Sequence, residues 1–154
     1  MIQTTLNFLI EGDKVLLAMK KRGFGAGKWN GVGGKLRAGE NPTQAIIRES
    51  AEEIGVTISP KDIVSVGVMD FHFTDRPDWD QRCHVFVTRA WQGEPAESEE
   101  MRPQWYGFAD VPYDSMWIDD KHWLPFVLQG KNVKATFHFS NGGADMVSHD
   151  VKTA

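Results

Sequence analysis

The 154-residue sequence predicts a mixed α+β sandwich, in which two helices cover a β-sheet. Three observations predict this class. Short runs rich in β-branched and aromatic residues recur along the chain, two segments change to a helical period between capping residues, and no repeat or linker divides them. The length suits one domain with a real core and is too short for two. We therefore expect one domain over residues 1–154, with one active surface.

The first elements are two strands over residues 4–10 and 14–20, separated by a turn-forming Glu-Gly-Asp. A glycine-dense segment follows over residues 22–35, and its six glycines in fourteen residues exclude a helix or a long strand. Such a loop can bring backbone N–H groups close to an anionic ligand. An irregular connection without a ligand is the alternative.

A helix is expected next, over residues 42–54. Asn41 can cap it, Pro42 suits the first helical position, and Gln44 completes a capping box. Gly55 is a natural stop, because glycine readily adopts the left-handed conformation that ends helices. The helix therefore carries its own start and stop signals.

The remaining elements follow in order. Strands are expected over residues 63–73 and 81–91, joined by the polar turn 74–80, and an acidic loop over 93–103 leads to a strand over 103–110. A second helix is expected within residues 116–130, with an Asp cap, a terminal glycine and a bend at Pro125. An Asn-Gly-Gly turn predicts a hairpin in the tail over residues 133–151.

Composition and charge exclude other classes. The chain is 41% hydrophobic and 25% charged, which is ordinary for a soluble globular protein. A net charge of −4 leaves no broad basic surface for a nucleic-acid polymer. We expect neither secretion nor a membrane span, since no signal peptide is present and no apolar run approaches about 18 residues. The single Cys83 cannot form an internal disulfide, so we expect a reduced, cytoplasmic compartment.

The first helix carries a cluster of glutamates. At 100° per residue, one side is an apolar stripe expected to face the core, made of Ile47, Ala51 and Ile54. Glu49, Glu52 and Glu53 are expected on the other side, as neighbours about 5–6 Å apart at Cβ. These like charges repel one another, and a divalent cation would remove the repulsion. A solvated acidic face is the alternative, and only the wider spacing decides between them.

That spacing is specific. Fixed residue types occur at the intervals G-x5-E-x7-R-E-U-x-E-E-x-G-U, carried by Gly34, Glu40, Arg48, Glu49, Glu52, Glu53, Gly55 and Val56. Seven fixed positions would arise by chance in such a chain with a probability on the order of 10⁻⁶. Ser50 departs from the pattern, which has a bulky aliphatic residue there, at the edge of the expected stripe.

The pattern is the Nudix box, and the sequence resembles the Nudix hydrolases. Within that family it is similar to the MutT-type oxidised purine nucleoside triphosphatases of animals, over residues 20–35, the box, 97–105 and 116–131. The resemblance implies an α/β/α sandwich with a catalytic helix and a C-terminal helix. It also implies a monomer that hydrolyses 8-oxo-dGTP and 2-oxo-dATP to the monophosphate and pyrophosphate, in nucleotide-pool sanitation. The cofactor would be Mg²⁺, with Mn²⁺ as the other candidate.

The resemblance also implies roles for single residues. The metal ligands would be the Gly33 carbonyl and the carboxylates of Glu49, Glu52, Glu53 and Glu100. Glu53 is the first choice for the residue that orients or deprotonates the attacking water, Glu100 is the second, and Glu49 belongs to the same catalytic set. Arg48 is expected to be structural, because it can reach Glu52 or Glu40.

Substrate recognition is assigned in the same way. Trp117 would stack on the base, and Asp119 and Asp120 would bond its edge, sharing a proton that lets the pair accept two oxidised purines. The substrate-binding set is Thr5, Lys20, Phe24, Asn30, Gly33, Gly34, Lys35, Phe71, Phe73, Trp117, Ile118, Asp119, Asp120 and Trp123. Lys21, Arg22 and Lys28 are expected to be solvated charges.

One segment departs from the animal enzymes. The turn at residues 74–82 places Trp79, Gln81 and Arg82 where a Leu-Met pair would be expected, beside the base. Alternative Nudix substrates are therefore ADP-ribose, a dinucleoside polyphosphate or an alkylated purine nucleotide. A binding module that has lost catalysis is a further alternative, but all the box carboxylates are present.

Overall fold

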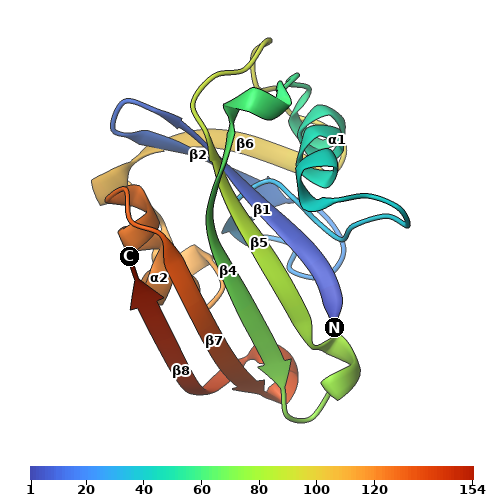
Figure 1. The fold of residues 1–154 in the computed structure, drawn as a ribbon, viewed down its shortest axis with the longest axis vertical. Coiled ribbons are helices and arrows are strands. Elements are labelled where there is room, and N and C mark those ends of the chain that lie inside the picture. The colour runs from blue at the N-terminus through green and yellow to red at the C-terminus, as the bar shows by residue number, and fades with distance from the viewer.

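The computed structural model describes residues 1–154, which form one mixed β-sheet with two α-helices (Figure 1). The predicted α+β class is confirmed. The strands are β1 (Ile2–Glu11), β2 (Lys14–Lys20), β3 (Trp29–Asn30), β4 (Ile63–Phe73), β5 (Gln81–Thr88), β6 (Met101–Gly107), β7 (Val133–Ser140) and β8 (Asp145–Thr153). The helices are α1 (Pro42–Ile54) and α2 (Asp120–Leu128), and neither is long and apolar enough to cross a bilayer.

Strand β1 connects the two parts of the sheet. It pairs antiparallel with β2 only at its end, through Ile10 with Val15 and Glu11 with Lys14, and it runs parallel to β5 over residues 2–9. Beyond β5 the order continues β4, β7 and β8, while β2 pairs with both β3 and β6 (Figure 1). The end of β1 therefore joins a small sheet to a larger one.

The two helices cover opposite faces of the sheet at β1. Phe8 belongs to a core cluster with Trp123 of α2, and the next residue, Leu9, belongs to a second cluster with Ile54 of α1. Successive side chains of a strand point to opposite faces. An α/β/α sandwich results, as the resemblance implied.

Helix α1 has the predicted bounds and caps. The Asn41 side chain accepts a hydrogen bond from the Gln44 N–H at 2.8 Å, and the Gln44 side chain accepts one from the Asn41 N–H at 2.9 Å. Gly55 ends the helix at φ 70°, in the left-handed region. Both capping signals in the sequence are therefore confirmed.

The predicted core-facing stripe of α1 is wrong for two of its three residues, while the third, Ile54, is buried as expected. Ala51 is exposed and Ile47 is half-buried, whereas the buried face is formed by Ala45, Ile46, Ser50, Glu53 and Ile54. The helix is rotated so that Glu53 lies on the buried side, beside the fully buried Ser50. Burying a carboxylate has a high cost unless it is paired or ligated, so this orientation indicates a site.

The boundaries of three other elements differ modestly from those expected from the sequence. Strand β5 ends at Thr88, and β6 begins at Met101, inside the expected acidic loop. Helix α2 begins only at Asp120, and the Asp119 side chain makes no capping hydrogen bond. That side chain has a different partner, described below.

Candidate active site

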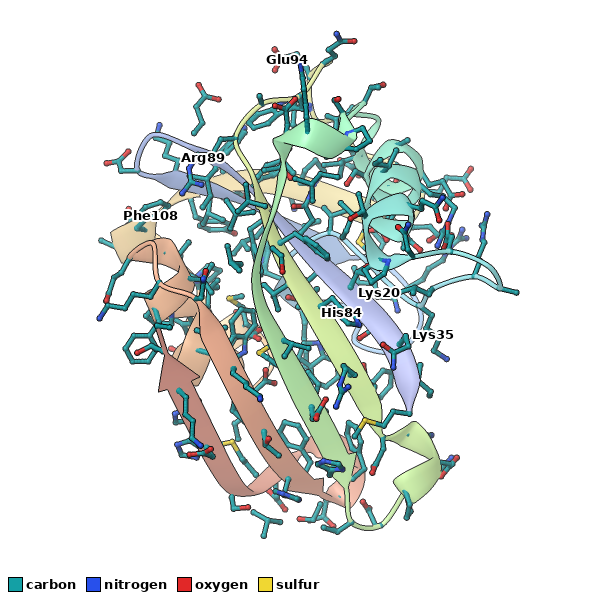
Figure 2. The ribbon with its side chains drawn as sticks, viewed as in Figure 1. Lys20, Lys35, His84, Arg89, Glu94 and Phe108 are labelled. Carbon is teal, nitrogen blue, oxygen red and sulfur yellow. The ribbon has the colours of Figure 1, made fainter.

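A cavity of about 320 Å³ opens between β1, the glycine-dense loop, β5 and the start of α2. All but two of the expected substrate residues line it: Thr5, Lys20, Phe24, Asn30, Gly33, Gly34, Lys35, Phe71, Phe73, Trp117, Asp119 and Asp120. These residues are separated by up to 115 positions in the chain and are brought together only by the fold. Lys20 and Lys35, labelled in Figure 2, give the cavity two cationic side chains.

The two exceptions are Ile118 and Trp123. Ile118 is 37% exposed and lines a neighbouring hollow of about 410 Å³ with Tyr113 and Lys121. Trp123 was expected in the pocket wall, and this is wrong: its side chain is fully buried and packs edge-on against Phe8, with ring centroids 5.9 Å apart. Successive side chains at the start of a helix point in different directions, so Ile118 and Trp123 lie outside the cavity that Trp117, Asp119 and Asp120 line.

Trp123 instead contacts the acidic pair from the buried core, through a hydrogen bond to Asp119. Its indole Nε1–H donates a hydrogen bond to Oδ2 of Asp119 at 2.9 Å, wholly within the buried interior. Asp120 lies beside Asp119, and one of its carboxyl oxygens, Oδ2, has no hydrogen-bond partner. Asp119 and Asp120 are 6% and 2% exposed.

Burial sets the charge of this pair. It raises the pKa of Asp119, which the Trp123 N–H bond lowers in part, and it raises the pKa of Asp120 well above its usual range. The neighbouring Asp119 charge raises the pKa of Asp120 further. Burial therefore favours the protonated form of Asp120 more strongly than that of Asp119, and both side chains line the cavity, where a protonated carboxyl can donate a hydrogen bond beside an acceptor.

Aromatic rings form the mouth of the cavity. The Phe24 ring, which is 62% exposed, lies 5.2 Å from the Trp117 ring and 5.7 Å from the Trp79 ring between centroids. Lys28 was expected to be solvated, but its Nζ lies 5.2 Å from the Trp117 ring centroid, and the residue lines the cavity. A cation on an indole face is attracted to the ring quadrupole, which holds Trp117 in place.

The glycine-dense loop closes tightly on β1. Thr5 N–H donates to the Gly34 carbonyl at 2.9 Å, and a Cβ at Gly33 would lie 2.0 Å from the Thr5 carbonyl oxygen. A Cβ at Gly34 would lie 3.0 Å from Oε1 of Glu49. Close approach to the backbone therefore requires a glycine at position 33, whereas at position 34 a Cβ would meet the end of a flexible side chain; the two contacts place the loop against β1 and α1.

Arg48 links the loop to the glutamates, as expected. Its Nε donates to Glu40 Oε2 at 2.6 Å and its Nη1 donates to Glu49 Oε1 at 2.8 Å, with Glu52 Oε2 at 3.3 Å. Its Nη2 reaches the Lys35 carbonyl at 3.3 Å. The Arg48 bond is the main cause that lowers the pKa of Glu40 to about 2.

Glu53 is in a different environment from the other glutamates. It is 5% exposed and its Oε2 has no hydrogen-bond partner. Burial, followed by the neighbouring Glu49 and the charge of Glu100, raises the pKa of Glu53 to about 10. A carboxyl here would be ionised at neutral pH only with a cation nearby.

The expected metal ligands do not form a closed cluster in this structure. No three acidic, histidine or cysteine side chains converge on one point. Glu49 and Glu52 are bonded to Arg48, and Glu100 faces the Arg22 guanidinium at 3.7 Å. The metal assignments of Gly33, Glu49, Glu52, Glu53 and Glu100 therefore stay predictions.

Several cavity residues were not expected from the sequence: Leu6, Ala18, Gly25, Lys28, Gly31, Cys83, Met101, Phe139 and Gly143. Gln81, expected near the base, also lines the cavity, whereas Arg82 is exposed and pairs with Asp70 at 2.8 Å. Strand alternation could have found Cys83, which follows Gln81 by two positions. Burial raises the pKa of Cys83 to about 12, so its thiol is protonated.

The fold and the box helix define the class of protein. Residues 2–127 match the family model of the NUDIX domain, and the chain belongs to this family. It resembles the crystal structure of a MutT protein from Bacillus halodurans with a TM-score of 0.85, at 25% identity, over 99% of this chain and 98% of that one. The family identified from the motif is confirmed.

Two animal proteins are similar over most of their length. The chain is 43% identical to an oxidized purine nucleoside triphosphate hydrolase of Danio rerio, over 93% of this chain and 88% of that protein. It is 41% identical to a protein of the same name from Mus musculus, over 89% and 86%. An 8-oxo-dGTP diphosphatase of Escherichia coli is 30% identical over 58% of this chain.

Proposed function

We propose that this protein hydrolyses oxidised purine nucleoside triphosphates, 8-oxo-dGTP and 2-oxo-dATP, to the monophosphate and pyrophosphate. The observation that carries the proposal is the Asp119–Asp120 pair, buried at the inner end of a cavity whose mouth holds Trp117. The names of the Danio rerio and Mus musculus relatives support the same substrate class.

The acidic pair suits an oxidised purine. A protonated Asp120 offers an O–H donor and an acceptor, and Asp119 offers acceptors, so the pair can meet a base edge that carries both kinds of group. Exchange of the proton between them would reverse the pattern. Two purines with different edges, 8-oxoguanine and 2-oxoadenine, can thus be bonded by one pair, with Trp117 stacking on the ring.

The residues present fit a divalent cation, and we propose Mg²⁺, with Mn²⁺ as a substitute. The donor set consists of carboxylates and the Gly33 carbonyl, the oxygen ligands that these ions prefer. The buried Oε2 of Glu53, which has no hydrogen-bond partner, fits a cation ligand, because a buried carboxyl is ionised only when a positive charge lies near it. Bound cations supply charge neutralisation at phosphorus and lower the pKa of the attacking water.

The chain's own residues then have distinct roles. Glu53 would orient the attacking water and accept its proton, with Glu49 and Glu100 beside it. Lys20 and Lys35 would hold the phosphates between the base cavity and α1. Arg48 positions Glu49 and ties α1 to the loop through Glu40.

A substrate panel tests the proposal. We expect kcat/KM with Mg²⁺ to be higher for 8-oxo-dGTP and 2-oxo-dATP than for dGTP and dATP, since specificity is the ratio of these values. Equal values for oxidised and ordinary nucleotides would contradict it.

A second candidate is another nucleoside-diphosphate substrate, namely ADP-ribose, a dinucleoside polyphosphate or an alkylated purine nucleotide. The turn at residues 74–82, which differs from that of the similar animal enzymes, is the reason to test this candidate. Trp79 of this turn packs on Phe24 at the mouth of the cavity, and Gln81 lines the cavity. The same panel, extended to these compounds, separates the two candidates.

A further inference from the structure

One polar side chain of the cavity wall has no role in the proposed chemistry. Gln81 is the first residue of β5, and its side chain lines the cavity together with Cys83, two positions further. His84, labelled in Figure 2, is separated from Gln81 by an odd number of positions and projects from the opposite face of the strand. Gln81 lies in the turn where the sequence departs from the similar animal enzymes, so it is a feature of this chain.

The Gln81 amide is only loosely held. Its Oε1 accepts from the Thr4 hydroxyl at 3.4 Å, and its Nε2 donates to the Trp79 carbonyl at 3.4 Å. Both contacts are longer than ordinary hydrogen bonds and are therefore weak. The Thr4 hydroxyl has a second acceptor, the Arg82 carbonyl at 3.4 Å, so it keeps a partner if the amide turns toward a ligand.

Gln81 and the acidic pair address different parts of a bound base. The Asp119 and Asp120 charges raise the pKa of the Cys83 thiol, so the pair lies near Cys83. Gln81 precedes Cys83 by two residues on β5, which corresponds to about 7 Å along the strand. A purine held at one edge by the aspartates would thus present another edge to the amide.

We propose that Gln81 is a specificity-determining residue that recognises the N7–H and C8=O groups of an 8-oxopurine. This assignment rests on the proposed function and narrows its substrate class. An amide carries an acceptor and a donor side by side, which complements N7–H and C8=O in a two-bond contact. Guanine has an unprotonated N7 and a C8–H at the same edge, so it offers the amide only one bond.

The test is the Gln81→Met variant, which keeps the side-chain length and removes both hydrogen-bonding groups. We expect kcat/KM for 8-oxo-dGTP to fall about tenfold, the loss typical of one bidentate amide contact. The value for 2-oxo-dATP should fall less than the 8-oxo-dGTP value, because its extra oxygen is on C2 and its N7 edge offers the amide only one hydrogen bond. The dGTP value should fall less than the 8-oxo-dGTP value, because guanine loses one hydrogen bond and 8-oxoguanine loses two, so that the preference for 8-oxo-dGTP over dGTP falls.

Two further variants make the result interpretable. Gln3→Met is the matched control, because Gln3 lies on the neighbouring strand β1, is exposed and bonds His84 outside the cavity. Gln81→Glu retains an acceptor for N7–H but places a negative charge opposite C8=O. We expect this variant also to lose the preference for 8-oxo-dGTP over dGTP in kcat/KM. Thermal melting of each variant verifies folding.

The possible outcomes distinguish a failure of the Gln81 assignment from a failure of the proposed function. If all three nucleotides change by one common factor, or none changes, the assignment of Gln81 is overturned while the proposed function stands. If the unaltered protein shows no preference for 8-oxo-dGTP over dGTP, the proposed function is overturned and the assignment of Gln81 with it.

Discussion

Replacing Trp123 by phenylalanine tests whether the tryptophan positions the acidic pair. The change keeps an aromatic ring in the core and removes the Nε1–H that donates to Asp119 Oδ2 at 2.9 Å. A buried hydrogen bond to an ionised group is worth about 1.5–3 kcal/mol. Asp119 can avoid part of this loss by binding a proton, so we expect the free energy of unfolding to fall by about 2 kcal/mol at neutral pH.

The pH dependence follows from the direction of the pKa change. The Trp123 bond lowers the pKa of Asp119, so its removal raises the folded-state pKa further above the unfolded value. A carboxyl with a raised folded pKa binds more protons when folded, and stability is lost as the pH rises toward that pKa. We therefore expect the deficit of the variant, measured by urea denaturation, to be larger at pH 8 than at pH 5.

Activity provides the decisive measurement. We expect KM for 8-oxo-dGTP to rise several-fold in the Trp123→Phe variant while kcat changes less, because base binding and not phosphate chemistry is affected. Trp91→Phe is the matched control, since Trp91 stacks on Trp105 in the other core cluster and makes no side-chain hydrogen bond to the site. A Trp123→Phe protein that loses stability but keeps KM would refute the positioning role.

Three further predictions follow from α1 and its loop. Arg48→Lys should lower the free energy of unfolding by about 2 kcal/mol more than Arg37→Lys does. The reason is that the forked contact of Arg48 with Glu40 is partly buried, whereas the single bond of Arg37 with Glu52 is exposed. Equal losses of unfolding free energy, measured by urea denaturation, would contradict this. Glu53→Gln should lower kcat for 8-oxo-dGTP at least about 100-fold with folding retained, and unchanged turnover would remove Glu53 from the mechanism. Gly33→Ala should reduce both thermal stability and kcat, because its Cβ would lie 2.0 Å from the Thr5 carbonyl oxygen; a variant with unchanged melting temperature and kcat would show that the loop can yield.

Much of the fold could be predicted because its signals are local. Caps at Asn41 and Gly55 defined α1 to the residue, and the run of β-branched and aromatic residues defined β4 over residues 63–73. The start of α2 was less well predicted, since an aspartate before a helix usually caps it, and here Asp119 bonds Trp123. Which of two local hydrogen-bond partners an aspartate takes depends on what is buried beside it.

The residues of the site were mostly named from the sequence, but their roles were not all predictable. Helical periodicity placed Ile47 and Ala51 toward the core, and the structure buries Ser50 and Glu53 instead. An amphipathic pattern assumes that polar residues face water. It fails where a helix buries polar residues, as α1 does with Ser50 and Glu53.

The sequence by itself determined the family, the box spacing, the approximate positions of most strands and the bounds of α1, because each depends on residue types at short intervals. The tertiary structure alone decided which glutamate is buried, which cation lies on Trp117 and which side of β5 faces the cavity. Trp123 and Gln81 show the reason most clearly. Trp123 bonds Asp119 from a core position fixed by its packing on Phe8 of β1, and Gln81 lines the cavity next to Thr4 of the same strand. Both positions depend on β1, which lies far away in the sequence and is brought into contact only by packing.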